Sequence, residues 1–334
     1  MKKIPAKSLN INGAAIELPC IGMGTFGSDK FSPRQVSDAV AGAIRCGYRL
    51  FDCASVYGNE DLIGEVFEKA LNDKTVARDE LFIMSKVWND MHGRGDVLLS
   101  CAKSLRDLRL DYIDLYFVHW PFPNYHAPGC GGDSRNPDSR PFFAGEFMSC
   151  WRQMERLADM GLAKSIGMSN MTMPKLEAVL PLCRIKPAAI EMELHPSFQQ
   201  KELFDYCIEK NIQPIGYCPI GSPNRPERDK TPDDIIDIEM PEIVQIAKSH
   251  NVHPAAVCLK WAAQHGQIPI PFSVNEDKYI SNLKCVAEDP LTPGEMAVIS
   301  DIDKNCRLIK GQVFLWEGAK SWEDLWDIDG EIVK

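Results

Sequence analysis

The sequence predicts an α/β protein whose strands and helices close into a (β/α)8 TIM barrel. Eight short apolar segments alternate with amphipathic segments along the chain, which is the pattern of parallel strands joined by right-handed helical crossovers. The 334 residues are 45% hydrophobic and 25% charged, so the chain can bury a large core. A barrel of about 250 residues with long loops accounts for this length, and we therefore expect one domain over residues 1–334.

Short apolar segments bounded by turn-forming residues are the expected barrel strands. They are Cys20–Met23, Tyr48–Asp52, Leu81–Val87, Ile113–Val118, Lys164–Met168, Ala188–Glu193, Gln213–Tyr217 and Gln267–Pro271. Ahead of them, Ser8–Ile11 and Ala15–Leu18 flank Asn12-Gly13, a residue pair that favours a hairpin turn. We therefore expect an N-terminal hairpin over about residues 8–18.

Helices are expected where apolar residues recur at helical spacing. These segments are Pro33–Cys46, Glu60–Leu71, Gly95–Leu108, Gly145–Met160, Pro174–Leu180, Gln200–Lys210, Pro241–Lys248, Pro254–Gln264, Asp277–Val286 and Pro293–Ile302. The alternative fold is a doubly wound sheet with a glycine-rich nucleotide-binding turn. Gly22–Gly27 has that spacing of glycines, but it follows a hairpin and lacks the acidic residue about 20 positions later. The barrel is therefore favoured.

Three segments are longer than barrel connections require: Trp120–Glu146, Pro219–Met240 and the tail Leu308–Lys334. The first two follow the fourth and seventh strands and so belong to the carboxyl face, where barrel enzymes work. We expect lids or binding loops there, with surface decoration as the alternative. The tail carries three tryptophans that would cap the barrel or form an interface: Trp316, Trp322 and Trp326.

The overall charge and the cysteines narrow the class of partner. A net charge of −10 and a pI near 5.3 oppose binding to phosphate backbones, so we expect no nucleic-acid partner. No apolar stretch reaches the roughly 18–20 residues that span a bilayer, so we expect no membrane partner. The 12 cysteines form no C-x-x-C pair and favour a reducing cytoplasm. We expect a monomer or a weak homo-oligomer.

Four polar residues stand at or just after three successive strand ends. Asp52 and His119 end the second and fourth strands, Lys86 lies near the end of the third, and Tyr57 lies five residues after Asp52. Strand ends converge at one mouth of a barrel. Asp52 is the natural counter-ion for a buried Lys86. The Lys86 cation would lower the pKa of Tyr57, which could then exchange a proton with a carbonyl oxygen that His119 polarises.

Each of these residues also has a simpler interpretation. The Asp52–Lys86 pair could be structural, Tyr57 a loop aromatic and His119 a core histidine. Their conjunction at successive strand ends favours the chemical interpretation. A buried lysine also permits a different enzyme class, a barrel aldolase or isomerase that uses Lys86 as a Schiff base. A third class is a binding or structural protein on the same scaffold.

The sequence resembles the aldo-keto reductase family from about Ile11 to Phe314. The motifs that carry the resemblance occur in the family's order: FDCASVYGNE, SKVW, DYIDLYFVHWP, GMSN, ELHP, GYCPIGSP and IPFSVN. The resemblance implies a (β/α)8 barrel that binds a nicotinamide cofactor without a Rossmann domain and reduces carbonyl groups. It matches Asp52, Tyr57, Lys86 and His119 to the family's catalytic tetrad, with Tyr57 as proton donor. It argues against the Schiff-base enzyme, which would not need Tyr57.

The same resemblance assigns residues to the cofactor, and we expect no metal. Ser169 and Asn170 match the pair that holds the nicotinamide carboxamide, and Tyr217 matches the tyrosine that stacks on the ring. Glu191 stands where the family usually has glutamine, so its charge would favour an oxidised, cationic ring. Further matched positions beside the ribose and pyrophosphate are Gly24, Thr25, Phe26, Asp52, Cys218, Pro219, Ile220, Gly221 and Ser222.

The adenosine end departs most from the family pattern. NADPH-preferring members usually carry a lysine and an arginine where this chain has Phe272 and Lys278. One cation is therefore lost, and the other is a point charge rather than a bidentate fork. The positions left to hold a 2′-phosphate or face the adenine are Ser273, Val274, Asn275, Lys278, Ser281 and Asn282. We expect NADP(H) as the favoured cofactor and NAD(H) as the second candidate.

The substrate is expected to be a small carbonyl compound or its alcohol. The predicted pocket wall is aromatic and consists of Phe26, Tyr57, Trp88, His119 and Trp120. Such walls suit aldehydes, ketones and the apolar faces of sugars.

Overall fold

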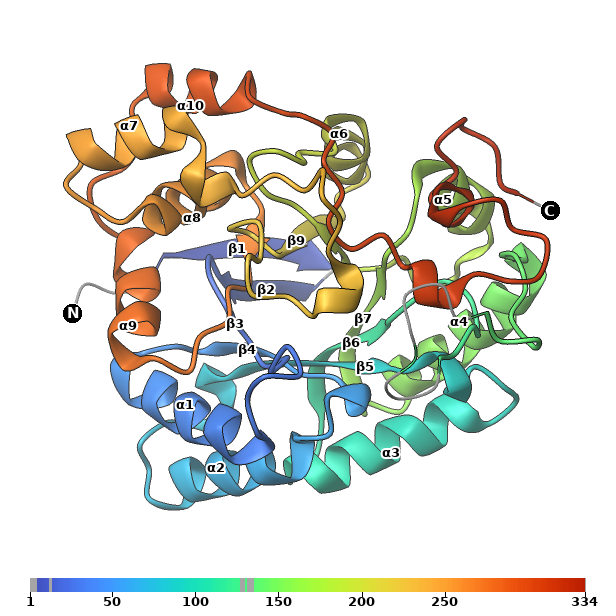
Figure 1. Cartoon of the computed structure of the whole chain (residues 1–334). Coiled ribbons are helices and arrows are strands. Elements are labelled where there is room, and N and C mark those ends of the chain that lie inside the picture. Colours follow the sequence, from blue (N-terminus) through green and yellow to red (C-terminus); the bar gives the residue numbers. More distant parts are fainter. Residues whose placement is uncertain (1–4, 12–13, 127–129, 131–134, 334) are drawn as a thin grey trace.

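A cylinder of eight parallel strands surrounded by helices forms the centre of the computed structural model (Figure 1). The structure describes residues 5–11, 14–126, 130 and 135–333. The barrel strands are β3 (Met23–Gly24), β4 (Leu50–Asp52), β5 (Phe82–Val87), β6 (Ile113–Val118), β7 (Ala163–Ser169), β8 (Ala189–Glu193), β9 (Gln213–Tyr217) and β10 (Ile268–Pro269). Neighbouring strands follow chain order throughout, and the predicted fold class is confirmed.

The first and last strands close the cylinder through a few backbone hydrogen bonds. Gly22 N donates to Pro269 O at 3.0 Å, and Gly24 N donates to Pro271 O at 3.1 Å. Because pairing at this seam is short, β3 is limited to Met23–Gly24, although the sequence predicts a strand over Cys20–Met23. The last predicted strand, Gln267–Pro271, is shortened to β10 for the same reason.

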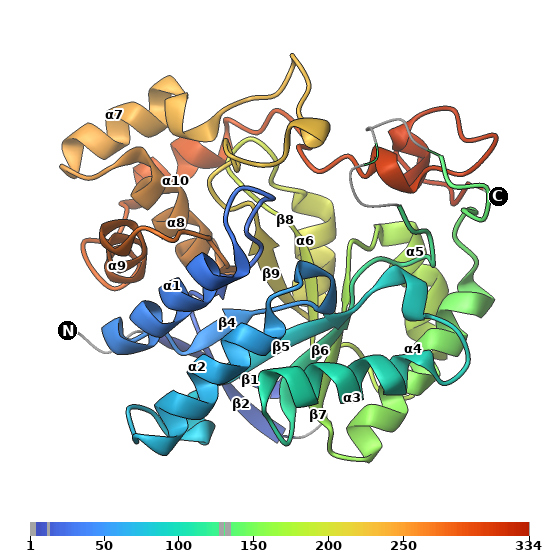
Figure 2. The ribbon, with the colours of Figure 1, turned by 60° about the horizontal axis from the view of Figure 1, so that its bottom comes forward.

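The N-terminal hairpin closes the amino-terminal end of the barrel. It consists of β1 (Ala6–Ile11) paired antiparallel with β2 (Ala14–Pro19), and the predicted Asn12-Gly13 turn lies outside the described residues. The Leu18 side chain packs among the interior apolar residues of the barrel and is 1% exposed. In Figure 2 the hairpin lies at the bottom and the chain's C-terminal tail at the upper right, toward the opposite end.

The described ranges contain ten α-helices. They are α1 (Pro33–Cys46), α2 (Glu60–Asn72), α3 (Asp96–Leu108), α4 (Ala144–Asp159), α5 (Met173–Val179), α6 (Lys201–Glu209), α7 (Pro241–Ser249), α8 (Pro254–His265), α9 (Glu276–Cys285) and α10 (Pro293–Ser300). Most of these helices cover the outside of the sheet, while α7 and α10 pack against each other and α7 against α8 (Figure 1). Local sequence sets their ends. In α1, Ser32 caps the first turn in a capping box with Gln35, and Gly47 ends the helix at φ 106°.

The barrel interior is filled by side chains from alternate strand positions. They are Leu50, Phe82, Met84, Leu115, Phe117, Ala189, Ile215, Ile268 and Ile270, together with Leu18 and Ala188. Gly167 makes room for the Phe117 ring, since a Cβ at Gly167 would lie 2.4 Å from that ring. The interior is therefore a packed core, and any ligand site must lie above it.

The tail packs against the α5 side of the barrel (Figure 1). It contains the short 3-10 helices Gln312–Phe314 and Trp322–Leu325. The buried Lys175 pairs with Asp327 and donates to Leu325 O at 2.8 Å. Trp316 and Trp326 are buried in an apolar cluster with Trp120 and Phe314, so these two tryptophans cap the barrel rather than project into solvent.

All 12 cysteines are free thiols in the structure. Over the described ranges, no helix combines the length and the apolar character that a bilayer crossing requires.

Candidate active site

A deep cavity of about 1070 Å³ opens at the carboxyl ends of the barrel strands. Its wall includes residues from the ends of β4, β7, β8 and β9, from the long loops and from the tail. The volume is at the upper end of the range for small-molecule sites. The cavity therefore has room for more than one small ligand group at the face where barrel enzymes carry out their chemistry.

A buried lysine organises the floor of the cavity. Lys86 in β5 is 0% exposed, and its ammonium group pairs with the Asp52 carboxylate at the end of β4. Lys86 Nζ also lies 3.3 Å from Glu191 Oε1 and 3.3 Å from the Tyr57 hydroxyl. Its Nζ donates to Cys53 O at 3.2 Å as well. The structure thus brings Asp52, Tyr57 and Lys86 together as the sequence predicts.

The protonation state of Tyr57 differs from the expectation. The sequence predicts a pKa lowered by the neighbouring Lys86. In the structure, burial raises the pKa of Tyr57 above its ordinary value, and the Lys86 cation opposes this rise without reversing it. Desolvation outweighs the ion, and the Asp52 carboxylate paired with Lys86 offsets part of its charge. Tyr57 therefore carries its proton at neutral pH.

His119 stands next to the tyrosine at the end of β6. The two rings meet edge to face with centroids 5.8 Å apart, and Trp88 packs on the other side of His119 at 5.0 Å. Burial, then Lys86, holds the pKa of His119 well below 6.5, so the imidazole is neutral. A neutral imidazole carries one N–H donor, and His119 can offer it to an oxygen atom in the cavity.

Glu191 adds a second carboxyl group beside Lys86. It lies in β8, lines the cavity and is 3% exposed. Burial and the Asp52 carboxylate raise its pKa to about 8, while Lys86 lowers it. At neutral pH the side chain is mostly protonated, so it can donate and accept hydrogen bonds as a glutamine does. The expectation of an ionised Glu191 is therefore wrong at neutral pH and holds only above about pH 8.

The predicted carboxamide-binding pair is held in place by its own hydrogen bonds. Asn170 adopts a left-handed conformation at φ 58° and donates to His119 O at 2.9 Å. Ser169 Oγ donates to Glu191 O at 3.0 Å. The Tyr217 hydroxyl donates to Asn170 Oδ1 at 2.6 Å, which fixes the plane of the Tyr217 ring in the cavity wall. These hydrogen bonds hold the three side chains in fixed positions in the cavity wall.

Two comparisons identify the family. The family model described as the aldo/keto reductase family matches residues 20–304. The chain is 38% identical to "Aldo-keto reductase family 1 member A1-A" of Danio rerio over 92% of this chain and 93% of that protein. It is also 38% identical to "Aldo-keto reductase family 1 member A1" of Xenopus tropicalis, covering 88% of each. The chain belongs to the aldo-keto reductase family. It is therefore an oxidoreductase.

A solved aldo-keto reductase has the same fold. The crystal structure of a Bombyx mori aldo-keto reductase in complex with NADP matches with a TM-score of 0.79 and 30% identity, over 92% of this chain and 95% of that one. Family membership removes the support for the Schiff-base enzyme, since the family catalyses oxidation and reduction.

Of the other positions that the aldo-keto reductase resemblance assigns to the cofactor, most line the cavity and a few lie behind the lining. The lining positions are Gly24, Phe26, Asp52, Cys218, Pro219, Ile220, Ser222 and Phe272. Thr25 lies behind the wall, because its fully buried hydroxyl donates to Asp52 O at 2.8 Å. Gly221 also lies behind the lining and has a left-handed φ of 73°.

The predicted 2′-phosphate positions lie at the start of α9, outside the cavity lining. Asn275 caps this helix by accepting from Lys278 N at 3.0 Å, and Ser273 Oγ accepts from Asn275 N at 3.1 Å. Lys278 is exposed, whereas Glu276 and Asp277 add two carboxylates in the same turn. Val274, Ser281 and Asn282 are likewise beyond the lining residues. The predicted 2′-phosphate region is therefore exposed to solvent, and it combines one cation, Lys278, with two carboxylates.

The predicted aromatic wall is present, and it is larger than expected. Phe26, Trp88 and Trp120 line the cavity with Tyr57 and His119. Residues that the sequence did not single out complete the wall, and they come from the loops and the tail: Val56, Tyr125, His126, Arg225, Ile309, Val313 and Phe314. The sequence identified the tail only as a cap or an interface, because nothing in it shows which residues point inward.

Proposed function

We propose that this aldo-keto reductase reduces aldehydes or ketones to alcohols, reversibly, with NADP(H) as the favoured cofactor and NAD(H) as the second. One observation supports this more than any other. The Tyr57 hydroxyl lies 3.3 Å from the buried Lys86 ammonium group in the floor of a deep cavity, with the His119 ring beside it. A protonated phenol next to a fixed cation is suited to deliver a proton in a reduction.

Features of the cavity fit a nicotinamide cofactor. His119 Nδ1 and Glu191 Oε2 are buried, and neither makes a hydrogen bond to a residue within the described part of the chain. A Cβ at Gly24 would lie 3.0 Å from Ile270 O, so glycine lets these two segments of the cavity wall pack closely. The Bombyx mori relative is described in complex with NADP. Ser169, Asn170 and Tyr217 would hold the nicotinamide, which supplies the hydride when bound.

The protein's own residues supply the proton and the charge stabilisation. As the carbonyl carbon receives a hydride, the carbonyl oxygen takes the Tyr57 proton, and an alcohol results. The tyrosinate left behind lies beside Lys86, which Asp52 holds in position. The neutral His119 donates a hydrogen bond to the same oxygen as negative charge develops on it. In the oxidation direction the same proton returns to Tyr57.

The substrate class follows from the cavity wall. Phe26, Trp88, Trp120 and Phe314 present aromatic surface around the Tyr57 hydroxyl, which suits aldehydes, ketones and the apolar faces of sugars. We also propose that the enzyme acts in the reducing cytoplasm, where 12 free thiols persist.

The decisive test replaces Tyr57 by phenylalanine. Tyr57→Phe removes only the hydroxyl, so we expect carbonyl reduction to fall by roughly 10²–10⁴-fold while cofactor binding persists. Steady-state kinetics with an aldehyde, ketone and sugar panel, together with titration by all four nicotinamide cofactors, measure both. Tyr206→Phe on α6 is the matched control, because Tyr206 is outside the cavity lining. Turnover by Tyr57→Phe at the wild-type rate would overturn the proposed role.

A further inference from the structure

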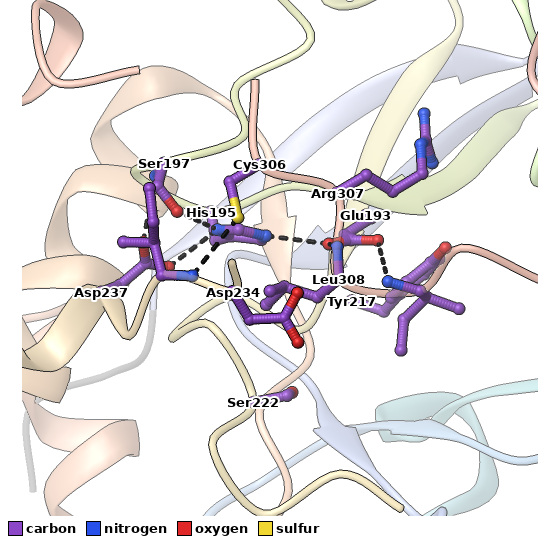
Figure 3. Close-up of polar contacts among 12 residues, drawn as sticks. Glu193, His195, Ser197, Tyr217, Ser222, Asp234, Asp237, Cys306, Arg307 and Leu308 are labelled. Carbon is purple, nitrogen blue, oxygen red and sulfur yellow. Dashed lines mark hydrogen bonds and ion pairs between the residues drawn. The ribbon is translucent and has the colours of Figure 1, made fainter. Parts of the chain in front are cut away.

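The ELHP segment at the end of β8 contains a fully buried histidine that the proposed reaction does not use. His195 is 0% exposed and lies between two carboxylates that are also 0% exposed (Figure 3). Its Nε2 lies 2.9 Å from Glu193 Oε1, and its Nδ1 lies 2.8 Å from Asp237 Oδ2. Ser197 Oγ is 3.2 Å from Nδ1. A cluster of this kind is costly to bury unless each charge is paired.

One carboxylate of the cluster holds the tail. Glu193 Oε1 accepts a hydrogen bond from Leu308 N at 2.7 Å, and Glu193 Oε2 accepts one from Ile309 N at 2.9 Å. Ile309 lines the cavity, as do Val313 and Phe314 a few residues later. The tail thus reaches the substrate side of the cavity directly from its attachment to Glu193.

The other carboxylate supports the loop after β9. Asp237 lies in the 3-10 helix Asp237–Glu239, at the far end of that loop. A Cβ at Gly221 would lie 2.8 Å from Asp237 Oδ2, so the backbone of the Cys218–Ser222 segment packs directly on this carboxylate. Asp237 Oδ1 also accepts from Ser197 N at 3.1 Å. Cys218 and Ser222 line the cavity on the predicted cofactor side.

The loop and the tail also contact each other next to the cluster. Lys310 Nζ lies 3.2 Å from Asp234 Oδ1, and Ile235 N donates to Cys306 Sγ at 3.4 Å. The tail is thus bonded to Glu193, the loop supplies Asp237, and the two segments also contact one another directly.

The imidazole of His195 is positively charged. Burial alone would lower the pKa of His195, but Asp237 and Glu193 outweigh it and raise the pKa to about 9. Burial would raise the pKa of Glu193, but His195 first and the nearby Arg307 guanidinium second hold it below its usual range. Burial keeps the other titratable groups around the two carboxylates neutral by raising their pKa: Tyr217, Cys218, Cys258 and Cys306.

We propose that the His195 imidazolium is a positioning group that joins residues 218–240 and residues 306–314 into one unit and thereby shapes both the cofactor and the substrate sides of the cavity. His195 is not among the residues that line the cavity. Without the imidazolium, the two buried carboxylates would lose the cation that lies between them and would keep only their backbone hydrogen bonds and the nearby Arg307. The inference rests on the proposed function for its kinetic consequences, but the coupling of the two segments is independent of it.

Hydrogen–deuterium exchange of the full chain tests the coupling without cofactor or substrate. In His195→Gln, we expect peptides from residues 218–240 and from residues 306–314 to exchange at least about tenfold faster, with the barrel strands unchanged. His250→Gln is the matched control, since His250 also lies between two carboxylates, Asp289 and Glu295, but away from the cavity. Faster exchange in only one of the two segments, or in neither, would overturn the inference.

Binding and kinetics test the positioning. We expect His195→Gln to raise the cofactor Kd and the carbonyl KM several-fold each, with kcat changed by less than about threefold, because no reacting group is removed. A loss confined to kcat would contradict a positioning role. If the wild-type protein binds no nicotinamide cofactor, the proposed function fails while the exchange result still decides the coupling. If the wild type binds and His195→Gln binds equally well, the inference alone fails.

Two further measurements keep the test decisive if His195→Gln does not fold. Asp237→Asn keeps the shape of the cluster and removes one charge, and we expect the same two segments to exchange faster. In the wild-type protein, raising the pH from about 8 to about 10 discharges most of His195, whose pKa is about 9, and part of Arg307, because burial lowers the pKa of Arg307 to about 10. The same pH step in Asp237→Asn, which keeps Arg307, separates the two groups. Exchange corrected for its intrinsic pH dependence should then increase in both segments together. Unchanged protection at the higher pH would overturn the inference.

Discussion

At the scale of single residues, the cavity floor shows that burial first, and neighbouring charges second, set the protonation of Tyr57, His119 and Glu191. Lys86 is shared by two buried carboxyl groups, Asp52 and Glu191. The sequence was sufficient to predict that Asp52, Tyr57, Lys86 and His119 meet, because strand ends converge in a barrel. It was insufficient to predict that Tyr57 stays protonated, because that depends on burial and on how far Asp52 offsets the Lys86 charge.

We predict that the ionisation of Glu191 makes the preference between oxidised and reduced cofactor depend on pH. Its pKa is raised to about 8, so the group is neutral below that pH and anionic above it. The Glu191 carboxylate in the cavity wall would favour the cationic, oxidised nicotinamide over the neutral, reduced one. We expect the wild-type ratio of oxidised to reduced affinity to rise by up to about tenfold between about pH 6.5 and about pH 9. Fluorescence titrations with both forms measure this ratio.

The matched variant for this prediction is Glu191→Gln, which cannot ionise. Its affinity ratio should resemble that of the wild type near pH 6.5 and stay flat as the pH rises. An equally steep ratio in Glu191→Gln would assign the pH dependence to another group, such as Asp52.

At the scale of elements, regular structure was predictable and long-range contacts were not. The predicted strands Ile113–Val118 and Gln213–Tyr217 coincide with β6 and β9, because each is an apolar run with clear boundaries. The contacts that shape the loops join residues far apart in sequence. Glu193 and Leu308 are 115 positions apart, and their hydrogen bond depends on how two loops fold over the barrel.

At the start of α9, we predict that Lys278 decides the preference for NADPH over NADH. Lys278 is the cation at the predicted 2′-phosphate position, and Glu276 and Asp277 oppose an anion there. Lys278→Ala should therefore raise the Kd for NADPH by roughly tenfold and the Kd for NADH by less than about twofold. Lys284→Ala, in the last turn of the same helix, is the control. An equal loss for both cofactors would remove Lys278 from the phosphate site.

At the scale of the whole molecule, stability and function are separated along the barrel axis. The cavity lies at the carboxyl ends of the strands, whereas the hairpin closes the opposite end (Figure 2). Barrels of this kind tolerate varied loops at one face because the interior below is a complete core. The aromatic cluster around Trp120 and Trp326 adds the tail to the cavity face without entering that interior.

Leu18 tests this separation. It belongs to β2, is 1% exposed and packs in the barrel interior at the hairpin end. Leu18→Ala should lower the free energy of unfolding by about 2–4 kcal/mol, since it removes buried methyl groups and leaves a cavity. Urea unfolding followed by circular dichroism measures this loss. Leu182→Ala is the control: Leu182 is 60% exposed, so its substitution should cost less than about 0.5 kcal/mol.

The cofactor Kd of Leu18→Ala should equal that of the wild type at temperatures where both are folded. A weakened cofactor affinity in that variant would show that the two ends of the barrel are energetically coupled.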